Sequence, residues 1–187
     1  MMGGPSPSLK VVFLDVDGVL LSARSLTYDF EDSDDTLFHD PAGVQVPIER
    51  CLLQNLQRLL QTTGARIVLS TTWRLEPDMR AFLMIALASV GIAASAVLGD
   101  TPDLKAAGRG AEVARWVEQH RPVEFAIVDD DDRHAASFAE HSLSARFVQT
   151  VMRDEGGDRS REGLTAEKAA LVVAIIEGQA ERLAERG

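Results

Sequence analysis

The stretch KVVFLDVDGVLLS, Lys10 to Ser22, constrains the fold of this chain more than any other segment. Its apolar run from Val11 to Leu14 is typical of a buried strand, and it leads directly into Asp15 and Asp17, with Gly18 next. Two carboxylates at the end of a buried strand would each cost several kcal/mol if they stayed unpaired. The stretch therefore predicts a strand whose end carries both acids into a site where a positive group neutralises them.

Short apolar runs alternate with helical patterns along the rest of the chain, and this alternation predicts an α/β fold with a parallel sheet. We expect strands at Lys10–Asp15, Arg66–Ser70, Ser95–Gly99, Phe125–Asp130 and Ala145–Thr150. We expect helices over Pro47–Gly64, Pro77–Gly91 and Gly110–His120, and a last helix capped by Thr165. Because 187 residues suit one domain, we predict a flexible leader over residues 1–9 and a single domain over residues 10–187.

Polar residues follow three of these strands at the point where each strand ends. Asp15 and Asp17 follow the first, Ser70 ends the second, and the four aspartates Asp129–Asp132 end the fourth. The carboxyl ends of parallel strands share one edge of the sheet, where ligands bind in such folds. Taken alone, an Asp-x-Asp-Gly segment also fits a turn or a calcium loop, and four aspartates also fit a solvated turn. Together, the strand ends predict one active site.

Acids from two strands suit a divalent cation, and Mg²⁺ prefers hard oxygen ligands. We therefore expect Asp15, Asp17, Asp129 and Asp130 to hold Mg²⁺. In such a site Asp15 would attack the phosphorus of a substrate phosphate. Asp17 would protonate the leaving oxygen and later take a proton from water. Ser70 would bind a phosphoryl oxygen through its hydroxyl group.

The residues directly after Ser70 are candidates for substrate binding. We expect Thr71 to help bind the phosphate through the turn that it begins, and Arg74 to contact it. Trp73 fits core packing and a substrate platform equally well. Phosphoryl transfer also needs a cationic side chain that neutralises charge in the transition state. The four histidines show no metal-ligand pairing, so we expect them on the surface or in packing.

Several motifs resemble those of a known superfamily. FLDVDGVL, Phe13–Leu20, resembles the first motif of the haloacid dehalogenase (HAD) superfamily, an apolar strand followed by Asp-x-Asp-Gly. IVLS, Ile67–Ser70, resembles its second motif, and FAIVDDDD, Phe125–Asp132, resembles its fourth. More narrowly, VLSTTWR, the Arg-Gly-x-Glu helix start at Arg109–Glu112, IVDD, and GLT at Gly163–Thr165 resemble the HAD domains of the Swiss Army Knife RNA repair group.

The resemblance implies a three-layer α/β/α Rossmann-like fold whose parallel sheet has the strand order 5-4-1-2-3. It also implies Mg²⁺-dependent phosphoryl transfer through an aspartyl-phosphate on Asp15, with Asp129 or Asp130 completing the metal site. The roles of Asp17 as general acid and base and of Ser70 as phosphate ligand are those that the family motifs imply.

The third motif of the superfamily is usually a lysine about one helix before the fourth motif. Lys105 and Arg109 both lie in the corresponding region. Lys105 matches the residue type of the superfamily, whereas Arg109, at a helix start, matches the narrower group. Both remain candidates, and Arg109 is favoured.

The segment over about residues 21–47 is an acidic insert that is too short for a folded cap domain. Its stretch Asp29–Asp40 carries six acidic residues and no Lys or Arg, which is more than half of the net charge of −10. We expect a loop or flap and a minimal cap or none. An open site suits a bulky substrate such as a nucleic-acid end, although the acidic stretch would repel a polyanion or favour a basic partner.

These patterns lead us to expect a Mg²⁺-dependent phosphomonoester hydrolase, and the resemblance to the RNA repair group implies nucleic-acid ends or nucleotides as its substrates. The alternatives are a small-metabolite phosphatase and a non-catalytic binding or regulatory module with the same fold.

The single cysteine, Cys51, excludes an internal disulfide and is typical of the cytoplasm. No apolar run approaches the ~20 residues of a membrane span, and the N-terminus lacks the pattern of a secretory signal.

Overall fold

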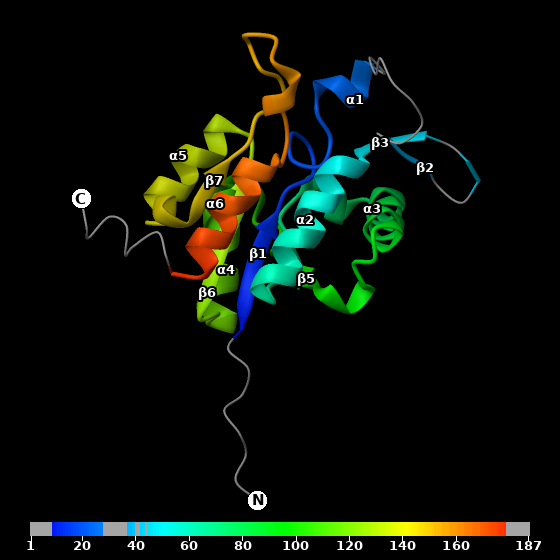
Figure 1. Cartoon of the computed structure of the whole chain (residues 1–187). Coiled ribbons are helices and arrows are strands. Elements are labelled where there is room, and N and C mark those ends of the chain that lie inside the picture. The colour runs from blue at the N-terminus through cyan, green and yellow to red at the C-terminus, as the bar shows by residue number, and fades with distance from the viewer. Residues whose placement is uncertain (1–8, 28–36, 40–41, 44, 179–187) are drawn as a thin grey trace, which may run out of the picture.

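The structure is a computed structural model that describes residues 9–27, 37–39, 42–43 and 45–178. The expected leader, residues 1–9, falls almost wholly outside these ranges, as does most of the acidic stretch Asp29–Asp40. In the described part of the chain, a parallel sheet lies between two layers of helices (Figure 1). The expected three-layer α/β fold is confirmed.

The parallel sheet has five strands in the order β5-β4-β1-β6-β7. Their bounds are β1 Lys10–Leu14, β4 Arg66–Leu69, β5 Val97–Asp100, β6 Glu124–Asp129 and β7 Phe147–Gln149. When only the strands of this sheet are counted along the chain, the order is the expected 5-4-1-2-3. The labels differ from that numbering because β2 (Leu37–His39) and β3 (Gln45–Glu49) form a separate antiparallel pair.

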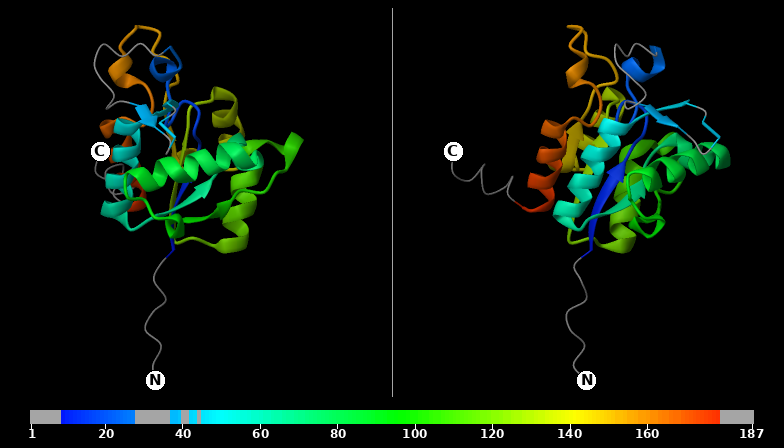
Figure 2. Two further views of the ribbon diagram at one scale, coloured as in Figure 1. Left: turned by 90° about the vertical axis from the view of Figure 1, so that its right-hand side faces the viewer. Right: turned by 45° about the vertical axis from the view of Figure 1, so that its right-hand side comes forward.

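Helices cover both faces of the sheet (Figure 2). On one face, α2 (Arg50–Thr63), α3 (Pro77–Ser89) and α6 (Ala166–Ile176) pack with the side chains of Val12 and Leu14. On the other, α4 (Gly108–His120) and α5 (Asp132–Glu140) pack with Val11 and Phe13. Successive residues of a strand point to opposite faces, so the continuous apolar run of β1 fills both layers of core.

Local sequence signals set the ends of several helices. Gly64 ends α2 in the left-handed region, with φ of 66°, and its N–H donates to the carbonyl of Leu60. Pro77 opens α3 at a position where its missing N–H costs nothing. The hydroxyl of Thr165 accepts the N–H of Lys168 and caps α6.

The start of α2 differs from the expected Pro47. Pro47 to Glu49 belong instead to β3, and the helix begins at Arg50. The reason is a buried charge: Glu49 is fully buried, pairs with Arg24 of α1 (Ala23–Thr27), and accepts the hydroxyl of Ser22 at 2.6 Å. This tertiary contact fixes the backbone of Glu49 in an extended conformation just before the helix.

The register of the sheet lines up the three strand ends that carry polar residues. Leu14 of β1 pairs with Leu69 of β4 and with Val128 of β6. The next residue of each strand is Asp15, Ser70 or Asp129, so these three side chains begin at the same level of the sheet edge.

Among the helices that the structure describes, none has the length and apolar character that a membrane crossing requires.

Candidate active site

Three carboxylates meet at this edge of the sheet. Asp15, Asp129 and Asp130 each place one oxygen within 4.8 Å of the other two. Burial, together with the nearby Asp129, raises the pKa of Asp15 to about 7 and that of Asp130 to about 6. Clustered carboxyls that resist ionisation form a site that a cation would stabilise, and their hard oxygen atoms fit a divalent metal such as Mg²⁺. The donor set therefore fits the expected metal.

Gly18 allows this arrangement of acids. Its φ is +67°, and a Cβ built there would lie 2.1 Å from Cγ of Asp130. A side chain at position 18 would therefore collide with Asp130 as well as strain the turn. The glycine that follows the two aspartates in the sequence makes room for an acid from another strand.

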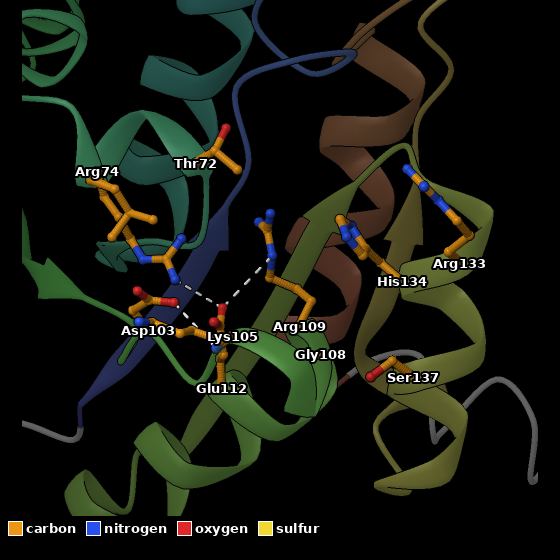
Figure 3. Close-up of a pocket in the computed structure, with 11 residues that line it drawn as sticks. Thr72, Arg74, Asp103, Lys105, Gly108, Arg109, Glu112, Arg133, His134 and Ser137 are labelled. Atoms are coloured by element: carbon orange, nitrogen blue, oxygen red, sulfur yellow. Dashed lines mark hydrogen bonds and ion pairs between the residues drawn. The ribbon is translucent and has the colours of Figure 1, made fainter.

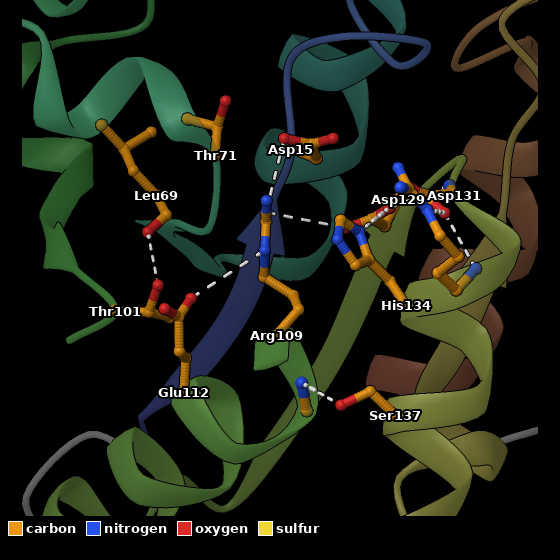
Figure 4. Close-up of polar contacts among 12 residues, drawn as sticks. Asp15, Leu69, Thr71, Thr101, Arg109, Glu112, Asp129, Asp131, His134 and Ser137 are labelled. Atoms are coloured by element: carbon orange, nitrogen blue, oxygen red, sulfur yellow. Dashed lines mark hydrogen bonds and ion pairs between the residues drawn. The ribbon is translucent and has the colours of Figure 1, made fainter. Parts of the chain in front are cut away.

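Arg109 is the cation that reaches the acids (Figure 4). Its Nη1 lies 3.4 Å from Oδ1 of Asp15 and 3.6 Å from Oδ2 of Asp129. The guanidinium is buried, and it opposes the rise in the pKa of Asp15. Lys105, the other candidate, is exposed, and its side chain forms no ion pair with the described residues. The geometry thus favours Arg109 for the third-motif role.

Ser70 presents an unpaired hydroxyl beside the acids. The residue is 2% exposed, and its Oγ has no hydrogen-bond partner in the part of the chain that the structure describes. A buried hydroxyl without a partner is destabilising by itself. Its neighbour Thr71 is fully buried and uses Oγ1 to accept the N–H of Trp73, 3.3 Å away.

Asp17 differs from the expectation that it joins the metal site through its side chain. The group of clustered carboxylates contains Asp15, Asp129 and Asp130 but not Asp17. Oδ2 of Asp17 instead accepts the indole N–H of Trp73 at 3.1 Å. Burial raises the pKa of Asp17, while Trp73 and Arg109 lower it, and the net direction is upward. A raised pKa suits an acid that must donate a proton.

Arg74 also differs from its expected role as a phosphate contact. Its guanidinium donates to the carbonyls of Thr71 at 2.6 Å and Thr101 at 3.1 Å, and to Glu112 Oε2 at 2.9 Å. The Arg74 and Glu112 side chains are both nearly fully buried. Arg74 therefore ties the turn after Ser70 to α4, because its donors are used within the protein.

The structure adds site residues that the sequence patterns did not indicate. Trp73 is buried and orients Asp17 rather than forming a platform. His134, on α5, lies 2.9 Å from Asp129 through Nδ1, and this contact raises the pKa of the imidazole. Asp131 caps α5, and its bond with Arg133 lowers the pKa of its carboxyl to about 2. In the sequence, the only indication of helix α5 (Asp132–Glu140) is Asp131, a residue type that commonly caps the start of a helix.

A pocket of about 430 Å³ opens next to the acids (Figure 3). We call Asp15, Asp129 and Asp130 the acid group. Arg109 and His134, which both contact the acid group, form part of the wall of the pocket. Lys105, Arg133 and Thr72 also line it. The hollow lies between α4, α5 and the turn after β4, and it adjoins the acids through Arg109 and His134.

The chain is similar to known proteins in sequence and in structure. The family described as "HAD domain in Swiss Army Knife RNA repair proteins" matches residues 11–169. No curated protein matches the chain. Two solved structures are similar to the chain over most of their length. A hypothetical protein from Xanthomonas campestris is 17% identical with a TM-score of 0.47, covering 96% of this chain and 88% of that one. A protein described as a HAD family hydrolase, from Streptomyces avermitilis, is 15% identical with a TM-score of 0.44, covering 91% of each chain.

Proposed function

Since this chain belongs to the family of HAD domains in Swiss Army Knife RNA repair proteins and is a HAD-type hydrolase, we propose that it hydrolyses phosphomonoesters with Mg²⁺ through an aspartyl-phosphate. The observation that carries the proposal is the convergence of Asp15, Asp129 and Asp130 around the guanidinium of Arg109. The unpaired hydroxyl of Ser70 supports it, because a phosphoryl oxygen would supply the missing partner.

Asp15, Asp129 and Asp130 would hold the divalent metal. When bound, Mg²⁺ supplies positive charge that offsets both the acids and the incoming phosphate. Arg109 adds a fixed cation beside Asp15, which favours the ionised form of that carboxyl and attracts a phosphoryl group. Ser70 orients one phosphoryl oxygen.

The reaction then proceeds in two steps. A carboxylate oxygen of Asp15 attacks phosphorus, the bond from phosphorus to the ester oxygen breaks, and the Asp17 carboxyl gives its proton to the leaving oxygen. In the second step the Asp17 carboxylate takes a proton from water, and the water oxygen attacks the phosphorus of the aspartyl-phosphate. The bond between phosphorus and the Asp15 oxygen breaks, inorganic phosphate leaves, and Asp15 and Asp17 return to their starting forms.

We further propose a nucleic-acid end or a nucleotide as substrate, because the matching family is described by RNA repair. A small-metabolite phosphatase is the second candidate, and the open hollow beside the site accepts either. A non-catalytic module is disfavoured by the complete set of acids at the site.

The test is hydrolysis of p-nitrophenyl phosphate with Mg²⁺ and with EDTA, followed by a panel of phosphorylated oligonucleotides, nucleotides and sugar phosphates. We expect metal-dependent turnover that falls at least about 1,000-fold in Asp15→Asn. The panel then separates the two substrate classes. Folded protein with Mg²⁺ that turns over no member of the panel would support the non-catalytic alternative.

A further inference from the structure

Two hollows adjoin the acid group, and they carry opposite charge. The cationic pocket is the hollow of about 430 Å³ described above, which includes Arg109 and His134. The acidic pocket, of about 490 Å³, contains Asp130 together with Asp132, Asp154 and Glu155, and one cation, Arg153. The whole chain has a net charge of −10, so the cationic pocket is a local exception. An anionic substrate is attracted to one side of the site and repelled from the other.

The two carboxylates in the cationic pocket are already bound by the chain itself. Glu112 is buried, and its oxygens accept the guanidinium of Arg74 at 2.9 Å and the N–H of Leu104 at 3.1 Å. Oδ1 of Asp103 accepts the N–H of Lys105 at 3.2 Å. The ion pair with Arg74 offsets the negative charge of Glu112, and Asp103 keeps its charge while bonding the backbone of Lys105.

Three side chains of the pocket have hydrogen-bond donors that no other described residue of the chain uses. Nζ of Lys105 has no ion-pair partner there. Arg133 bonds Asp131 through Nε and Nη2, and Nη1 remains available on a side chain that is 89% exposed. Thr72 adds an exposed hydroxyl group.

The segment that carries Lys105 is held in a fixed conformation. Lys105 has a φ of 49°, in the left-handed region that non-glycine residues rarely adopt. The bonds from Leu104 to Glu112 and from Lys105 to Asp103 hold the backbone there. The ammonium group is thus presented from a preorganised loop next to the start of α4.

We propose that Lys105, Arg133 and Thr72 bind a second phosphate of the substrate, outside the phosphate that is cleaved. The inference rests on the proposed function and deepens it: the preferred substrate is a phosphomonoester that carries a further phosphate or phosphodiester. A phosphorylated oligonucleotide end and a free nucleoside bisphosphate both have this chemistry. A phosphomonoester with a single anionic group would bind more weakly.

The test uses a terminally phosphorylated dinucleotide and the same compound with an uncharged methylphosphonate linkage. In the second compound a methyl group replaces the anionic oxygen of the linkage, so the ratio of their kcat/KM values measures recognition of that charge. We expect the charged linkage to be preferred by about five- to thirtyfold, mainly through KM. Equal values for the two compounds would overturn the proposal. A nucleoside bisphosphate compared with its monophosphate distinguishes a free nucleotide from an oligonucleotide end as the source of the second phosphate.

Arg133→Gln should reduce this preference by about three- to tenfold, because it removes one charged contact. The matched control is Arg153→Gln, which removes a cation from the acidic pocket and should leave the preference unchanged. A preference that persists in both Arg133→Gln and Lys105→Gln would contradict the assignment to this pocket.

A binding measurement separates failure of this inference from failure of the proposed function. Fluorescently labelled dinucleotides of the two linkages are titrated with wild-type protein and with Arg133→Gln. Selective binding of the charged linkage, lost in the variant, supports the second phosphate site even if no phosphomonoester is hydrolysed. Equal binding of the two linkages overturns it, even if p-nitrophenyl phosphate is turned over.

Discussion

Ser70 holds a hydroxyl group in the core without a hydrogen-bond partner among the described residues. Replacement by alanine removes this unsatisfied group, so we expect Ser70→Ala to raise the free energy of unfolding by about 1 kcal/mol. The same change should lower kcat for phosphomonoesters by about 100-fold, because a donor to the phosphoryl oxygen is lost. Urea unfolding and steady-state kinetics measure the two effects.

Thr71→Ala is the control for this prediction. Its Oγ1 accepts the N–H of Trp73 and caps the short helix η1 (Thr72–Leu75), so its removal should destabilise the protein by about 1 kcal/mol. Ser70→Ala that is less stable than wild type would show that the hydroxyl has a structural role.

Trp73 should act on catalysis through Asp17. Trp73→Phe keeps an aromatic ring but removes the N–H that holds Oδ2 of Asp17. We expect the kcat for an alkyl phosphate to fall about tenfold more than the kcat for p-nitrophenyl phosphate, because only the alkoxide needs a proton to leave. Steady-state rates on the two substrates provide the comparison.

Trp116 provides the matching control for Trp73. Its indole is also buried, but it packs in the core between α4 and the sheet and stacks on the ring of His120, an exposed residue. Trp116→Phe should therefore lower stability without changing the ratio of the two rates. Equal losses on both substrates in Trp73→Phe would indicate that Trp73 serves packing alone.

Helix α4 is joined to η1 by the buried pair of Arg74 and Glu112. Glu112→Gln leaves the Arg74 guanidinium buried without its counter-charge, so we expect a loss of about 3–5 kcal/mol in unfolding free energy. The partly exposed pair of Arg80 and Asp100 is the control, since Asp100→Asn should cost less than about 1 kcal/mol. Thermal or urea unfolding measures both, and similar small losses would contradict the structural role of the Glu112 pair.

The strands of the sheet could be predicted from the sequence because each is a continuous apolar run with polar residues at its end. β1 and β4 differ from the expected bounds only in the final Asp15 and Ser70. The start of α2 could not be predicted, because the pairing of Glu49 with Arg24 depends on the folded chain. Helix α5 was not expected, because the run Asp129–Asp132 was interpreted as the end of a strand and part of the site, although Asp131 is a good capping residue.

The positions of the candidate site residues could be predicted better than their contacts. Strand ends place Asp15, Ser70 and Asp129 at one edge, and the register of the sheet fulfils that expectation. No sequence pattern states where a side chain points, so the bond between Trp73 and Asp17, 56 positions apart, was not expected. For the same reason, the bonds of Arg74 to the backbone and to Glu112 were not expected from the sequence.

The acid group should make the stability of the whole molecule depend on pH and metal. The pKa values of Asp15 and Asp130 are about 7 and about 6, above the value of 3.8 for the unfolded chain. The folded protein therefore holds more protons than the unfolded chain between about pH 4 and pH 7. Its stability is greatest at the lower end of this range and falls as the pH rises through about 6 and 7.

Thermal unfolding in EDTA tests this pH dependence. We expect a lower Tm at about pH 8 than at about pH 5, a weaker dependence in Asp15→Asn, and a rise in Tm when Mg²⁺ is added at the higher pH. The Asp131 carboxyl, with its pKa of about 2, titrates below this window. If the Tm in EDTA increased toward pH 8, the charges of the ionised acids would already be neutralised by other groups of the protein.

The role of Asp15 as nucleophile is tested most directly by trapping the phosphorylated enzyme. Rapid acid quench during turnover of p-nitrophenyl phosphate with Mg²⁺, followed by peptide mass spectrometry, locates any phosphoryl group on the chain. We predict a phosphoryl group on Asp15, absent in Asp15→Asn and in EDTA, and more abundant in Asp17→Asn because water activation is slowed. Turnover with no phosphoryl group on Asp15 at any quench time, or with one on another residue, would contradict the proposed mechanism.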